Sequence, residues 1–243
     1  MASRSHSHLS GLDINAIRNI IAQALINEAE TDSLARQLEA HSVNLHNSIR
    51  LPLGEREQVL LTFITRYIQH VPDYLEALIA VSAQASITKQ TRPILNVARD
   101  YFLLPPQQLQ IHVGLEALMD EAYLAHRLIE EINDQLLVLC GVPLTPMDMT
   151  RANLIVHHLI GEPFANELDN MVRHSVSKLA GSLTNFESHA FRDYVDDHKK
   201  RGWQEEVERW PCLAENLSIE LAFSKDNTAP SMIHETPSNG NLH

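Results

Sequence analysis

The segment from Leu115 to Cys140 contains neither Gly nor Pro, and its apolar residues recur three and four positions apart. This spacing predicts one face of a long α-helix, because successive residues turn by ~100° around a helix axis. A helix with one continuous apolar face has to pack against other elements, so it favours a multi-helix bundle. The apolar stripe consists of Ala117, Leu118, Ala122, Leu124, Ala125, Leu128, Ile129 and Ile132.

The rest of the chain continues the helical pattern. There are only 8 glycines among 243 residues, and no alternating run of β-branched residues marks a strand. We therefore expect an all-α chain, with Asp13 capping the first helix and Gly141 ending the long one. Pro72 is expected to end or kink a helix and Asp73 to cap the next one. At Gly161-Glu162-Pro163, either a new helix begins or one helix bends.

Composition and charge exclude several classes of function. The formal net charge is −12, so we expect no nucleic-acid binding through a broad basic surface. No run of about 18 apolar residues is present, so we expect no membrane span. The polar N-terminus shows no signal peptide, and the two cysteines, Cys140 and Cys212, form no CxxC motif. These features predict a cytoplasmic protein with reduced thiols.

The pattern indicates one domain with two polar tails. We expect a disordered N-terminal tail over residues 1–11, a single helical domain over 12–223 and a disordered C-terminal tail over 224–243. The Ser-His-Ser-His segment near the N-terminus can be native, a cloning remnant or a weak metal-binding tract. The core of the domain is expected from about 55–85, 107–140, 148–180 and 183–201, with the helices before residue 50 outside it.

Glu121 lies at the centre of the apolar stripe, where a leucine is expected. A second glutamate, Glu187, projects between Leu183 and Phe191 on another apolar face. A carboxylate that faces a helical core has to be paired, protonated or bound to a metal, because an isolated buried charge is too costly. Helical bundles hold metal ions with such carboxylates, gathered from facing helices. Hydrogen bonds from Tyr or His are the alternative.

The residues Leu118-Met119-Asp120-Glu121-Ala122-Tyr123 resemble the Asp-Glu-x-x-His helix of ferritin-like di-iron oxygenases, in particular the arylamine N-oxygenase family. The resemblance extends over about residues 55–201. It implies a ferritin-like bundle with extra N-terminal helices, two iron ions and an oxidoreductase activity on a small organic substrate. The metal ligands that it implies are Glu121 and Glu187, with Glu57, His158 and Glu162 completing the shell. The chain departs from the pattern, since Leu124 and Ala190 stand where the family has its histidines.

The missing histidines favour a second hypothesis, in which the chain is a non-catalytic helical module that binds a small molecule or a protein partner. Glu121 then orients a ligand or belongs to a buried polar network. A third hypothesis is a helical subunit of a larger assembly, and a homodimer is compatible with all three. On the helix of Glu121, the other polar residues are expected to face away from the core, with His126 and Glu130 paired on the surface.

Iron content tests the oxygenase hypothesis. After anaerobic reconstitution with ferrous iron, the chain should retain bound iron, and Glu121→Ala should lose it because a bridging carboxylate is removed. Glu121→Gln, which keeps the shape of the side chain, should also lose iron but keep the fold. A chain without bound iron, or unchanged iron in Glu121→Ala, contradicts this hypothesis.

Overall fold

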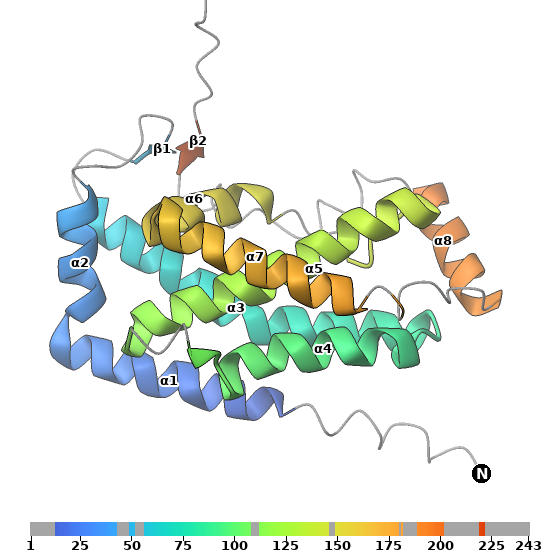
Figure 1. Ribbon diagram of the computed structural model, residues 1–243, viewed down its shortest axis with the longest axis horizontal. Helices are drawn as coiled ribbons and strands as arrows, with labels where there is room; N and C mark the ends of the chain where they lie inside the picture. Colours follow the sequence, from blue (N-terminus) through green and yellow to red (C-terminus); the bar gives the residue numbers. More distant parts are fainter. Residues whose placement is uncertain are drawn as a thin grey trace, which may run out of the picture.

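The structure is a computed structural model that describes residues 13–42, 49–51, 56–107, 112–145, 149–179, 181, 189–201 and 219–221 (Figure 1). These residues form mainly helices, which confirms the predicted all-α class. The helices are α1 (Ile14–Thr31), α2 (Ser33–Ser42), α3 (Arg56–Gln84), α4 (Thr88–Leu103), α5 (Gly114–Cys140), α6 (Thr150–Ile160), α7 (Glu162–Leu179) and α8 (His189–Arg201). Two short strands, β1 (Ile49–Arg50) and β2 (Glu220–Leu221), pair antiparallel. Both predicted tails lie outside the described residues.

Helix α5 lies in the middle of the bundle and packs against α1, α3, α4, α6 and α7 (Figure 1). Its predicted length is confirmed, but its burial is wider than the predicted stripe. Asp120, Tyr123 and His126 are buried together with the apolar residues, so the expectation that they face away from the core is wrong. The reason is that neighbouring helices cover α5 on several sides, which a helix at the surface of a domain does not experience.

The predicted helix ends of α1 and α5 are confirmed. The Asp13 side chain accepts a hydrogen bond from the Ala16 N–H at 2.9 Å, which satisfies a free donor at the start of α1. Gly141 adopts a left-handed φ of 77°, and its N–H bonds to the Leu137 carbonyl at the end of α5. Cys140 is half-buried, and its thiol donates to the Leu136 carbonyl.

Helix α3 passes through Pro72 without a break, so the predicted helix end at this proline is wrong. A proline inside a helix removes one backbone hydrogen bond and costs roughly 3 kcal/mol. The loss is offset by packing, because Tyr67, Val71 and Tyr74 on both sides of the proline are almost fully buried. Asp73 does not cap a new helix; it is exposed and pairs with Arg18 of α1 at 2.8 Å.

At Gly161 the structure resolves the alternative left open by the sequence, since α6 ends and a separate helix, α7, begins. Gly161 has φ 94° and ψ 137°, a conformation that residues with a Cβ atom rarely adopt. Pro163 is the second residue of α7, where its missing N–H costs no helical hydrogen bond. The two helices are therefore joined by one residue.

The composition of the core differs from the expected one. Helix α1 packs directly against α3, α4 and α5, and Leu34 and Leu38 of α2 are buried in the same core. The expectation that the helices before residue 50 lie outside the core is therefore wrong for both helices. The buried side chains Ile14, Ile17 and Ile21 bring α1 into the core. Helix α4, which was not assigned to the core, packs along α5 as well. Among the described helices, none has both the length and the apolar character of a membrane span.

Burial on α5 can be tested with one pair of matched substitutions. Leu128→Ala should lower the free energy of unfolding by about 2–5 kcal/mol, because it leaves a cavity at a site with 0% exposure. Leu139→Ala makes the same chemical change on the same helix, but at a site with 62% exposure. It should change the stability by less than about 0.5 kcal/mol. Urea unfolding followed by circular dichroism measures both, and equal losses contradict the described packing of α5.

Candidate functional site

Glu121 points into the core, as the apolar stripe predicts. It is 5% exposed, and its Oε2 atom has no hydrogen-bond partner. Burial, and to a smaller extent the neighbouring carboxylate of Asp120, raises the pKa of Glu121 to about 8. A raised pKa means that the side chain is a neutral acid at pH 7, so protonation replaces the missing charged partner.

Three of the other predicted metal ligands are among the described residues. Glu57 and Glu162 are exposed in the first turns of α3 and α7, whereas Glu121 is buried. Free backbone N–H groups and the helix dipole favour carboxylates at these positions without any metal. His158 is half-buried on α6. Glu187 lies outside the described residues.

No group of three or more His, Cys, Asp or Glu side chains that can hold a metal ion occurs in the described part of the chain. The described side chains therefore do not fit a di-iron centre, which needs carboxylates that converge on both metals. The predicted pairing of Glu121 with Glu187 stays a prediction.

A buried acid beside Glu121 contacts a histidine. The Asp120 carboxylate has 0% exposure, and its Oδ2 atom lies 2.6 Å from Nδ1 of His112. Nε2 of the same imidazole lies 3.2 Å from the Glu116 carboxylate, which also accepts a hydrogen bond from Gln37 of α2. Burial raises the pKa of Asp120 to about 6, although the hydrogen bond from His112 opposes this shift. The group links α2 to the first turns of α5.

His126 does not form the surface pair that its spacing from Glu130 predicts. It is 1% exposed, and its Nε2 atom lies 3.0 Å from the Tyr67 carbonyl of α3. Its ring packs against Tyr67, Tyr74 and His70. Burial lowers the pKa of His126 to about 3, so the imidazole is neutral and donates to the carbonyl. Its role in this structure is to connect α5 to α3.

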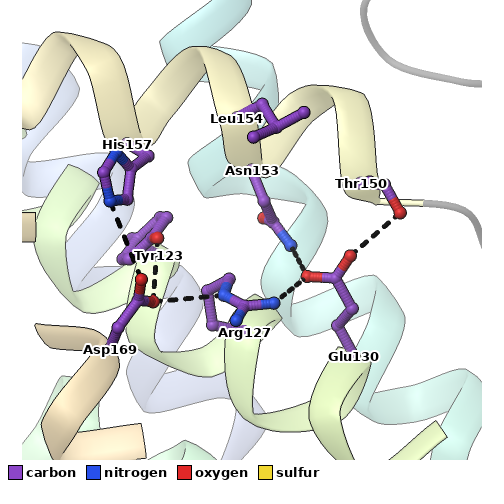
Figure 2. Close-up of a pocket in the computed structure, with 8 residues that line it drawn as sticks. All are labelled: Tyr123, Arg127, Glu130, Thr150, Asn153, Leu154, His157 and Asp169. Carbon is purple, nitrogen blue, oxygen red and sulfur yellow. Dashed lines mark hydrogen bonds and ion pairs between the residues drawn. The ribbon is translucent and has the colours of Figure 1, made fainter. Parts of the chain in front are cut away.

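A pocket between α5, α6 and α7 is lined by several polar groups (Figure 2). Its volume is about 250 Å³. We call it the α5–α6–α7 pocket. Its lining consists of Tyr123, Arg127, Glu130, Thr150, Asn153, Leu154, His157 and Asp169.

Arg127 is at the centre of the hydrogen-bond network in this pocket. Its Nη1 donates to Glu130 Oε2, and its Nε donates to Asp169 Oδ1 at 3.2 Å. Glu130 also accepts hydrogen bonds from Thr150 at 3.0 Å and from Asn153 at 2.6 Å. Figure 2 shows that the network runs across the pocket from His157 to Thr150. These bonds fix the guanidinium and both carboxylates in place.

The other end of the pocket contains an imidazole, a phenol and a carboxylate. The Tyr123 hydroxyl donates to Asp169 Oδ1 at 3.0 Å, while His157 Nε2 lies 3.7 Å from Asp169 Oδ2. Burial, followed by the negative charge of Asp169, raises the pKa of Tyr123 well above its usual value, so the phenol keeps its proton. Asn153 connects the pocket to the core, because its Oδ1 accepts a hydrogen bond from Tyr67 of α3 at 2.6 Å.

None of the pocket residues was predicted as a site residue, although a pattern for them exists in the sequence. Tyr123, Arg127 and Glu130 recur at four and three residues along α5, which places them on one face. Thr150, Asn153 and His157 recur at three and four residues along α6. Two polar stripes on neighbouring helices can face one another, but their contact depends on how the helices pack, which the periodicity does not specify.

Comparisons with protein-family models, with curated proteins and with solved structures find no match to this chain. The function therefore has to be argued from the geometry of the chain itself.

The raised pKa of Glu121 predicts a pH-dependent stability. Between pH 4.5 and about 8, the folded chain keeps a proton on Glu121 that the unfolded chain releases. Stability that is fully present below pH 4.5 is therefore lost as the pH rises to about 8, by on the order of a few kcal/mol. Glu121→Gln cannot ionise, so it should gain stability relative to the unchanged chain as the pH rises.

Urea midpoints of both chains at about pH 5 and about pH 9 measure this difference. Glu167→Gln, at an exposed position of α7, is the control and should follow the unchanged chain at both pH values. A difference between Glu121→Gln and the unchanged chain that does not vary with pH contradicts a buried neutral acid at this position.

Proposed function

We propose that this chain is a non-catalytic helical protein that binds a small polar organic molecule in the α5–α6–α7 pocket. The observation that carries the proposal is a cavity of about 250 Å³ beside a fixed network of charged side chains. Small-molecule sites are typically concave, with a few polar groups held in place beside apolar surface. Here Leu154, which is 47% exposed, supplies the apolar surface.

The energetic cost of the network supports a binding role. Arg127, Glu130 and Asp169 are each at most a quarter exposed in their side chains, with values of 24%, 16% and 21%. Removing charges from water is costly, and apolar side chains of similar volume often give equal or better stability. Partly buried charged side chains beside a cavity are enriched at functional sites. Since the groups are already fixed, a ligand loses little free energy in ordering them.

One feature disfavours Tyr123 as a nucleophile. Burial and the negative charge of Asp169 raise its pKa, whereas an activated hydroxyl needs a lowered pKa or a base that withdraws its proton. The pocket therefore presents hydrogen-bonding groups in fixed positions, with its phenol held in the protonated form.

The oxygenase hypothesis is a second candidate, and one observation favours it. Glu121 is buried with an oxygen atom that has no hydrogen-bond partner, which a metal ion can satisfy. Its raised pKa offers another solution, since a protonated acid needs no metal. The iron measurement described above separates the two, and the proposed pocket does not depend on its outcome.

Blocking the pocket tests the proposed function. Small polar organic compounds are screened against the full chain by ligand-observed nuclear magnetic resonance, and the compounds that bind are measured again with two variants. Leu154→Trp places a larger side chain at the edge of the pocket without removing a network group, and should weaken binding at least tenfold. Asn166→Trp makes a comparable change at an exposed position of α7 outside the pocket and should bind as the unchanged chain does.

The fold of both variants is verified by circular dichroism. If no compound binds, or if Leu154→Trp binds as well as Asn166→Trp, the α5–α6–α7 pocket is not the ligand site.

A further inference from the structure

We infer that the α5–α6–α7 pocket selects a small organic cation, an alkylamine whose ammonium group binds Asp169 Oδ2. This inference rests on the proposed function and adds the chemical class of the ligand. It depends on two features of the pocket: the carboxylates that outnumber the single guanidinium of Arg127, and the acceptor that Asp169 Oδ2 offers.

Negative charge exceeds positive charge around Arg127. Its guanidinium forms ion pairs with Glu130 and Asp169 and lies 3.9 Å from the carboxylate of Glu131. Three carboxylates therefore surround one guanidinium. An anionic ligand that enters the pocket meets this excess of negative charge, whereas a cation reduces it. In a partly buried site such charge differences are screened less than at an exposed surface.

The positive charge of Arg127 is already paired with carboxylates. Its Nε donates to Asp169 and its Nη1 donates to Glu130. Nη2 lies 3.9 Å from the Glu131 carboxylate, which is too long for a hydrogen bond but close enough for an ion pair. An anion that approaches the guanidinium therefore meets three carboxylates that share its positive charge, so the charge distribution disfavours anionic ligands.

Asp169 offers an acceptor to the pocket. Its Oδ1 atom accepts hydrogen bonds from Tyr123 and Arg127. Its Oδ2 atom lies 3.7 Å from His157 Nε2, which is longer than a hydrogen bond. A carboxylate oxygen has two lone pairs, so Oδ2 can accept hydrogen bonds from a ligand. An ammonium group there forms a charge-assisted hydrogen bond.

The surroundings of Asp169 suit a cation with a short apolar body. The rings of Tyr123 and His157 lie beside the carboxylate, with centroids 6.0 Å apart, and form part of the wall of the pocket. Leu154 can contact the carbon chain of the ligand. The cavity volume of about 250 Å³ has room for an amine of a few carbon atoms.

The test compares three probes of similar size and different charge: butylammonium, butanol and butyrate. Each is titrated into the full chain at near-neutral pH and low salt, and binding is followed by changes in backbone amide resonances. We expect butylammonium to shift resonances of α5, α6 and α7 and to bind at least tenfold more tightly than either other probe. Added sodium chloride should weaken this binding, because it screens the carboxylates.

Two charge-matched variants locate the cation. Asp169→Asn should weaken butylammonium binding at least tenfold, since it removes the charged acceptor. Glu167→Gln removes the same charge at an exposed position outside the pocket and should weaken it less than twofold. If Asp169→Asn does not fold, the ranking of the three probes on the unchanged chain still decides the inference.

The possible outcomes separate this inference from the proposed function. If butanol or butyrate binds in the pocket as tightly as butylammonium, the selectivity for a cation is wrong, but the pocket remains a ligand site. The same holds if Asp169→Asn and Glu167→Gln have equal effects. If butylammonium does not bind while other screened compounds do, the inference also fails. If nothing binds in the pocket, the proposed function fails with it.

Discussion

The central position of α5 is the constraint on which the rest of the structure depends. Helices α1, α3, α4, α6 and α7 pack against it and cover most of its length, while Asp134 and Leu139 near its end are exposed. A polar side chain on the covered part needs a partner on a neighbouring helix, because an unpaired buried polar group is costly. Glu116 contacts α2, His126 contacts α3, and Arg127 contacts α7 through Asp169. The polar residues of α5 thus connect the helices that surround it.

Two carboxylates on α5 show a different solution to the same constraint. Asp120 and Glu121 follow one another in sequence and are both buried, and each has an oxygen atom without a hydrogen-bond partner. Their pKa values are raised to about 6 and about 8, so Glu121 is mainly neutral at pH 7, whereas Asp120 becomes neutral only below about pH 6. Helix α5 therefore carries charged side chains that are paired with other helices, and also acids whose charge depends on pH. The paired charges line the pocket, while the acids make the stability of the fold depend on pH.

Local sequence signals predicted much of the fold and little of the site. The length of α5, the cap at Asp13 and the glycine end at Gly141 depend on periodicity and on the chemistry of single residues, which the sequence contains. The inward direction of Glu121 follows from the same periodicity. The path of α3 through Pro72 and the burial of His126 depend on packing between distant segments, which local rules do not describe. The same limit applies to Arg127 and Asp169, which lie on different helices and meet only in the folded bundle.

The joint at Gly161 sets the shape of the α5–α6–α7 pocket. Asn153 and His157 lie before it on α6, and Asp169 lies after it on α7, so one residue separates the two helices that form these walls. Insertion of one residue at this joint would rotate α7 by ~100° about its axis, if the rest of that helix remained regular. Asp169 would then turn away from Arg127. Homologous chains that keep this pocket should therefore also keep the length of the α6–α7 connection.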